Sequence, residues 1–134
     1  MQRVYLWPPA LALCLFFASG SSELATPEFG LSFSPDKLGH FLLFGLLATS
    51  ILRIPAIHAR GWRGAWIAVV LTFTYGAVDE WRQSLTPGRA VELYDLLADL
   101  LGAIVAVIAY RAWPTYRNCL EWAPFQRRRQ RAHN

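Results

Sequence analysis

The stretch DEWRQSLTPGRAVELYDLLADLLGA, residues 79–103, decides how this chain folds, because it places carboxylates among apolar residues. Four of its acidic residues lie inside or against strongly apolar sequence: Asp79, Glu80, Asp95 and Asp99. A charged residue at the centre of a membrane helix costs about 2.5–3.5 kcal/mol on insertion scales. Charged residues that persist there in spite of this cost are paired, functional, or both. The stretch therefore indicates a membrane protein with a polar site.

The composition agrees with a membrane protein. Of the 134 residues, 54% are apolar and only 16% are charged, whereas a typical soluble domain has about 25% charged residues. Four apolar segments have about the length of a membrane span, at residues 4–20, 37–57, 62–81 and 93–113. We predict an all-α integral membrane protein, a small four-helix transmembrane bundle. A soluble bundle is the alternative, but the chain has too little polar surface to cover four such helices.

The first segment has a second interpretation. Arg3, the apolar run after it and the small residues at positions 18–20 also resemble a signal peptide with a cleavage site. With the segment retained, we divide the chain into a first transmembrane helix and outer loop at 1–36, a three-helix core at 37–113 and a basic tail at 114–134.

Lys and Arg in the short loops predict the orientation in the membrane. The loop after the first segment has three acidic residues and no Arg, while the loop at 53–63 and the tail hold most of the basic residues. Both termini are therefore expected in the cytoplasm, and the loops at 21–36 and 82–92 outside. The net charge of +4 alone would suggest nucleic-acid binding, but no nucleic-acid-binding fold signature accompanies it. The partner that we expect is the lipid bilayer.

This topology brings polar residues from three helices to the extracytoplasmic end of the bundle. The predicted layer contains Asp36, Lys37, His40, Asp79, Glu80, Gln83, Arg89, Asp95 and Asp99. Asp36 and Lys37 share one helix face with His40, at spacings of four and three residues. Asp95, Asp99 and Gly102 form a second stripe, in which Gly102 lets a neighbouring helix approach closely. At its depth in the fourth segment, Asp99 should face the bundle interior.

The layer has a structural and a functional interpretation. As a polar staple, its charges neutralise one another and fix the order of the helices. As a site, Arg89, Lys37 and His40 bind an anionic group, or His40 acts as a general base that Asp36 or Asp95 orients. His40 and Asp95 are then the candidate catalytic residues, and whether the protein is an enzyme stays open. No ligand spacing for a metal is present, and we expect neither a metal nor a cofactor.

The motifs DKLGHFLLFGLLA, from residue 36, and DEWRQSLTPGRAVELYDLLADLLGA resemble the VanZ-like family of small bacterial membrane proteins. The matching positions are Asp36, Lys37, His40, Asp79, Glu80, Gln83, Pro87, Gly88, Arg89, Asp95 and Gly102. The chain departs from the family pattern at Asp99, where the family usually has Asn.

This resemblance implies a cell-envelope role in the bacterial inner membrane. The family's namesake is associated with low-level resistance to the glycopeptide antibiotic teicoplanin. The ligand implied is a lipid-linked envelope precursor or a glycopeptide-like anionic group. Two alternatives are an enzyme that acts on a lipid phosphate or cell-wall precursor, and a scaffold that partners a larger envelope enzyme.

Overall fold

The protein is all-α in the part of the chain that the computed structural model describes, residues 2–20, 35–85 and 93–121. In chain order the elements are η1 (Gln2–Tyr5), α1 (Trp7–Gly20), α2 (Pro35–Leu52), α3 (Pro55–His58), α4 (Trp62–Ser84), α5 (Leu93–Ala112) and α6 (Pro114–Glu121). The predicted all-α class is confirmed.

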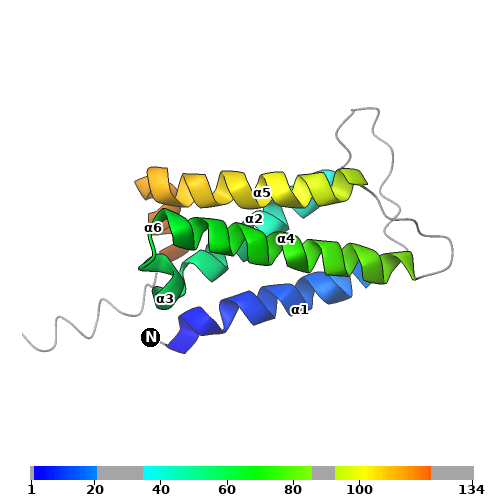
Figure 1. Cartoon of the computed structure of the whole chain (residues 1–134), viewed down its shortest axis with the longest axis horizontal. Helices are drawn as coiled ribbons and strands as arrows, with labels where there is room; N and C mark the ends of the chain where they lie inside the picture. Colours follow the sequence, from blue (N-terminus) through cyan, green and yellow to red (C-terminus); the bar gives the residue numbers. More distant parts are fainter. Residues whose placement is uncertain (1, 21–34, 86–92, 122–134) are drawn as a thin grey trace, which may run out of the picture.

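The four long helices α1, α2, α4 and α5 lie side by side along the long axis of the molecule (Figure 1). The short helices α3 and α6 lie at the end where α1 begins. We call this the basic end, because its elements hold Arg53, Arg60, Arg63, Arg111 and Arg117. At the opposite end α1 and α4 finish, and α2 and α5 begin. We call this the polar end. Helices α2 and α5 therefore run parallel from it.

Glycines allow α2 and α5 to pack closely. A Cβ atom on Gly102 of α5 would lie 2.1 Å from the backbone oxygen of Phe41 on α2, and one on Gly45 would lie 3.0 Å from the Cβ of Ala106. Only a residue without a Cβ permits this approach. The prediction that Gly102 lets a neighbouring helix come close is confirmed. Further toward the basic end the small residues Ala48 and Ala103 are fully buried in the core.

The structure corrects the second predicted segment, residues 37–57, which is two helices rather than one. Helix α2 ends at Leu52, and Pro55 begins the short helix α3. Ile54 before it is extended, with φ −60° and ψ 123°. Proline disfavours the helical conformation in the residue that precedes it, and its own missing N–H suits the first position of a helix.

The beginning of the predicted tail also has regular structure. Residues 114–121 form α6, which starts at Pro114 and packs Tyr116 and Leu120 against the core residues of the basic end. The run of arginines at 127–131 lies outside the described residues.

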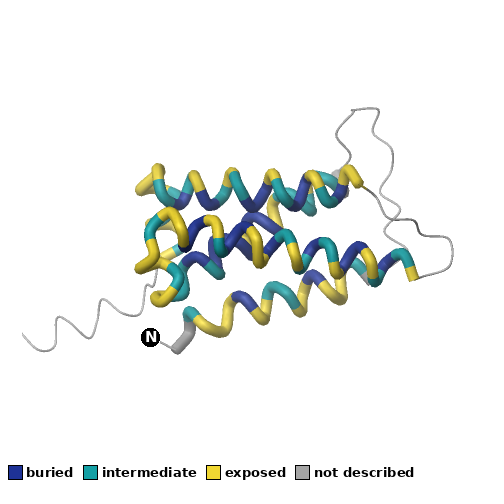
Figure 2. Tube along the Cα trace, viewed as in Figure 1, coloured by how far each residue is buried: buried dark blue, intermediate teal, exposed yellow. Residues whose placement is uncertain are grey.

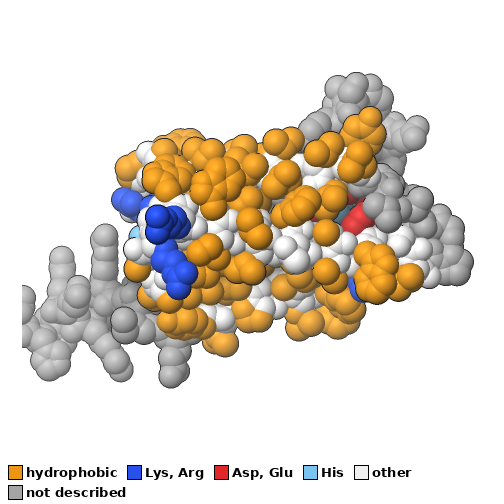
Figure 3. Space-filling view, viewed as in Figure 1, with side chains coloured by type: hydrophobic (Ala, Val, Ile, Leu, Met, Phe, Trp, Pro, Cys, Tyr) orange, Lys and Arg blue, Asp and Glu red, His pale blue; other side chains and the backbone are white. Residues whose placement is uncertain are grey.

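Large apolar side chains cover the outside of the bundle between its two ends (Figure 3). Exposed residues occur along the whole length of the long helices (Figure 2). The exposed ones on α2, α4 and α5 include Leu42, Leu46, Trp66, Val70, Leu71, Val78, Leu101, Val105 and Ile108. Among the described helices, α5 by itself is both long and apolar enough to cross a membrane, while α1 and α2 contain apolar stretches that are shorter. In Figure 3 the visible Lys and Arg side chains lie mostly at the basic end, and acidic side chains show at the polar end.

Candidate functional site

Two acid–base pairs join the start of α2 to the start of α5. The Nζ atom of Lys37 donates to Oδ1 of Asp95 at 3.0 Å, and Nδ1 of His40 lies 2.9 Å from Oδ1 of Asp99. The two bases are three residues apart on α2 and the two acids four apart on α5, so each set lies on one helix face. Because the helices run parallel, the two pairs lie one helical turn apart along the line of contact between α2 and α5, which we call the α2–α5 seam.

The structure gives His40 a partner that the sequence did not suggest, Asp99, which lies at hydrogen-bond distance. The sequence suggested Asp36 or Asp95 as the carboxylate that orients His40. The structure pairs Asp95 with Lys37, and the side chain of Asp36 lies outside the described residues. Because the helices are parallel, one turn along α2, from Lys37 to His40, corresponds to one turn along α5, from Asp95 to Asp99. The spacing within either helix alone could not show which residue of α5 faces a given residue of α2.

Aromatic and glycine residues fix the geometry around the His40–Asp99 pair. The ring of His40 stacks on Phe44, with centroids 5.8 Å apart and planes 8° from parallel, and Phe44 packs against Tyr75. On α4 a Cβ atom at Gly76 would lie 2.8 Å from Oδ2 of Asp99. Gly76 therefore leaves the space that this carboxylate occupies. The sequence analysis missed both Phe44 and Gly76.

A third pair lies on α4. Two guanidinium nitrogens of Arg82 bind Oδ1 of Asp79 at 2.9 and 3.0 Å, and Nε2 of Gln83 donates to its Oδ2 at 2.9 Å. Arg82 also donates to the Phe16 carbonyl oxygen at 3.2 Å and to Oγ of Ser19 at 2.8 Å. Its guanidinium lies 4.2 Å from the centroid of the Phe16 ring. This base holds the end of α1 on α4.

Arg82 was not among the predicted site residues. The signal that could have identified it is its spacing of three residues from Asp79, which puts the two side chains on one helix face.

In all three pairs the base is more exposed than the acid. The exposed fraction of the side chain is 25% for Lys37 against 9% for Asp95, 18% for His40 against 4% for Asp99, and 31% for Arg82 against 4% for Asp79. The carboxylates therefore lie inside the bundle, and the bases that they bind lie nearer the surface. We call the three bases Lys37, His40 and Arg82 the rim.

The structure brings together most of the predicted layer. Asp99 is buried, as predicted from its depth, and Asp95, Asp79, Glu80 and Gln83 are buried too. The prediction for Arg89 lies outside the described residues, as does the side chain of Asp36. Within the described part of the chain, no group of three His, Cys, Asp or Glu side chains is placed to hold a metal ion.

Comparison with known proteins identifies the family. The model of the VanZ/LLP1 family matches residues 6–114, which include α1, the polar end and all of α5. No curated protein and no solved structure matches the chain. The family match confirms the resemblance drawn from the two motifs, and it extends further toward the N-terminus than they do. The chain belongs to the VanZ/LLP1 family.

Proposed function

We propose that this protein is a VanZ-like protein of the bacterial inner membrane, with α1, α2, α4 and α5 as four spanning helices. At 1.5 Å per residue the 20 residues of α5 measure about 30 Å, the thickness of a bilayer core. The apolar exterior between two charged ends supports the same placement for α2 and α4. The 14 residues of α1 are shorter, and Tyr5 and Trp7 at its start are exposed, as interfacial anchors are.

The polar end is proposed to bind an anionic group that is lipid-linked or glycopeptide-like, on the extracytoplasmic side. The observation that carries this function is the exposure difference within the pairs. Lys37, His40 and Arg82 form the rim, and buried carboxylates orient them from below. A phosphate or carboxylate reaching the rim would accept hydrogen bonds from charged donors, which are the strong ones. If the pairs served only to fix the order of the helices, their bases would not need to lie nearer the surface than their acids.

The test is a binding titration of the detergent-purified full chain with two probes, farnesyl phosphate and teicoplanin. Mass spectrometry of lipids that co-purify with the protein adds an unbiased search for the natural ligand. Lys37→Gln removes one charged donor and should weaken binding of the correct probe by about tenfold or more, since hydrogen bonds to charged groups contribute about 1.5–3 kcal/mol. Lys37→Arg should restore part of the affinity.

The matched control is Arg60→Gln, which removes an exposed base at the opposite end and should leave the affinity unchanged. Equal affinity of Lys37→Gln and the wild type for both probes, with no anionic lipid retained, would contradict the binding function and favour the staple.

The His40–Asp99 pair supports a second candidate, a membrane enzyme that acts on a lipid phosphate or cell-wall precursor. A buried carboxylate 2.9 Å from Nδ1 fixes the ring, so that Nε2 can exchange a proton with a substrate. His40→Gln would then abolish turnover of the precursor while substrate binding persists. Loss of binding without any turnover in the wild type would favour the first function.

A further inference from the structure

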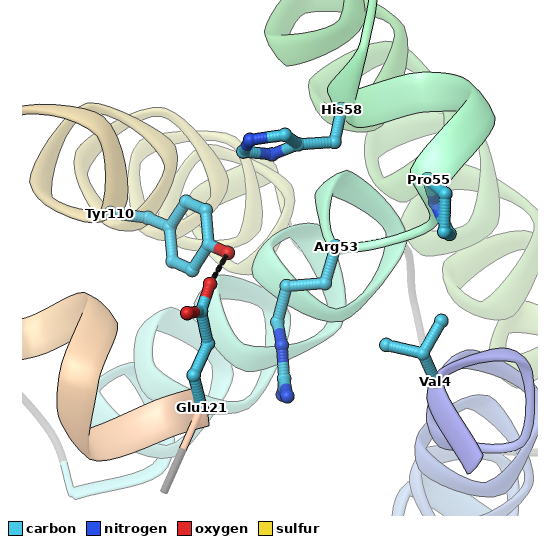
Figure 4. A pocket seen from close by; sticks show the side chains of 6 residues that line it. All are labelled: Val4, Arg53, Pro55, His58, Tyr110 and Glu121. Atoms are coloured by element: carbon cyan, nitrogen blue, oxygen red, sulfur yellow. Dashed lines mark hydrogen bonds between the residues drawn. The ribbon is translucent and has the colours of Figure 1, made fainter. Parts of the chain in front are cut away.

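A cavity lies at the basic end, away from the polar layer. It has a volume of about 290 Å³, close to the lower limit of about 300 Å³ for small-molecule pockets. Its walls come from η1, the α2–α3 turn, α3, α5 and α6. The lining residues are Val4, Arg53, Pro55, His58, Tyr110 and Glu121. Five separate parts of the chain therefore build one small cavity (Figure 4).

The cavity contains one cationic and one anionic side chain that are not paired with each other. The Tyr110 hydroxyl donates a hydrogen bond to the Glu121 carboxylate, and the His58 ring packs edge-on against Tyr110, with centroids 6.1 Å apart. Arg53 extends beside this group, with Val4 and Pro55 on its other side (Figure 4). Among the described residues no ion pair joins Arg53 to Glu121. The charges of Arg53 and Glu121 sum to zero.

The presence of one positive and one negative side chain in the cavity favours a zwitterionic ligand. A lone phosphate would be attracted by Arg53 but repelled by Glu121, and a lone ammonium would meet the reverse. A molecule that carries both charges a short distance apart satisfies both side chains. Arginine offers two parallel donors to phosphate oxygens, and a carboxylate accepts hydrogen bonds from a primary ammonium. The small volume excludes a glycopeptide but admits a headgroup.

We propose that this cavity binds a phosphoethanolamine group, with the phosphate on Arg53 and the primary ammonium on Glu121. In the membrane placement proposed above, the cavity lies at the cytoplasmic interface, where phospholipid headgroups are found. A zwitterionic lipid bound there would fasten η1, α3 and α6 to the end of the bundle. The inference thus goes beyond the anion site at the polar end, although it shares the membrane placement.

The test is native mass spectrometry of the detergent-purified full chain with short-chain phosphatidylethanolamine, phosphatidylglycerol and phosphatidylcholine. The wild type should retain phosphatidylethanolamine about tenfold better than the other two. Phosphatidylglycerol lacks the ammonium, and the methylated ammonium of phosphatidylcholine has no N–H to donate. Glu121→Gln should abolish the preference for phosphatidylethanolamine over phosphatidylglycerol. Arg53→Gln should weaken binding of both, and Arg53→Lys should restore part of it.

Two controls test whether the lipid binds in this cavity rather than to the basic end in general. Arg60→Gln and Arg63→Gln each remove an exposed base of the basic end outside the cavity, and neither should alter the lipid preference. A preference that disappears in Arg60→Gln, equal retention of the three lipids by the wild type, or an unchanged preference in Glu121→Gln would each overturn the proposal. Competition between free phosphoethanolamine and short-chain phosphatidylethanolamine identifies the source of the group. If free phosphoethanolamine at an equal concentration displaces the lipid, the natural ligand is soluble; if the lipid stays bound, the natural ligand is a lipid.

Discussion

Nδ1 of His40 lies 2.9 Å from Oδ1 of Asp99, although the two residues are 59 positions apart in the chain. The contact exists because α2 and α5 run parallel from the polar end and approach closely at Gly102, about one turn after Asp99 on α5. The site therefore depends on the helix packing beneath it. Changes to the α2–α5 seam and changes to the pairs themselves should have separable effects.

The close contact between α2 and α5 predicts that alanine will affect stability differently at two glycines. A Cβ atom at Gly102 would lie 2.1 Å from a backbone oxygen of α2, whereas nothing lies within 4 Å of a Cβ atom at Gly39. Gly102→Ala must push the helices apart and should lower the free energy of unfolding in detergent by about 1–3 kcal/mol. Gly39→Ala should be neutral or stabilise by up to about 1 kcal/mol, since alanine favours the helix.

The two alanine variants are compared by thermal unfolding, followed by circular dichroism. A melting temperature of Gly102→Ala equal to that of Gly39→Ala would show that the close approach of α2 and α5 is not needed for stability.

Arg82 is predicted to hold α1 in the bundle. Its guanidinium bonds to the Phe16 carbonyl oxygen and to Ser19, and it also lies over the Phe16 ring. Arg82→Gln removes these contacts and should speed hydrogen exchange of the backbone amides of residues 7–20, with α5 unchanged. Arg82→Lys should be intermediate, because lysine lacks the planar group. Arg63→Gln, an exposed base at the other end of α4, is the control; equal exchange in both Gln variants would contradict the role of Arg82.

Much of this site could be predicted from the sequence, since helical spacing and alternating topology place most of its residues. The four apolar segments fix which helix ends meet, and this already gathers Lys37, His40, Asp79, Asp95 and Asp99 in one layer. Spacing within a helix also shows which residues share a face. It does not show the register between helices, so spacing alone could not distinguish Asp95 from Asp99 as the partner of His40.

Other features depend on contacts that no local pattern records. Gly76 matters because Asp99 of another helix approaches it, and the cavity of the basic end needs five parts of the chain to meet. The break before α3 is different. Pro55 is visible in the sequence, and its effect on the preceding residue would have ended the second segment at the right place.

The proposed orientation predicts the outcome of reporter fusions. A reporter fused after Asn134 should report a cytoplasmic location, and one inserted within residues 21–36 an extracytoplasmic location, because most of the described Lys and Arg residues lie at the basic end. Sequencing of the mature N-terminus adds a check on α1, whose contacts with α4 favour a retained helix. An extracytoplasmic C-terminus would contradict both the topology and the outward-facing site.

The last prediction compares the same chemical change at two neighbouring carboxylates. In Asp99→Asn the amide keeps an oxygen acceptor and gains a donor, so a hydrogen bond to Nδ1 of His40 can form with either tautomer of the ring. Asp95→Asn instead removes the negative charge opposite the Lys37 ammonium, which is bonded at 3.0 Å.

We therefore expect Asp99→Asn to unfold at nearly the wild-type temperature and to bind the anionic probe normally. Asp95→Asn should cost about 1–3 kcal/mol in stability, less than a fully buried pair because Lys37 is partly exposed, and should also weaken binding as Lys37 loses its orientation. Melting temperature and farnesyl phosphate affinity are measured for both variants. If Asp99→Asn is the more harmful of the two, the charge of Asp99 is itself required. The His40–Asp99 pair would then act in acid–base chemistry, and the enzyme would become the better description of this site.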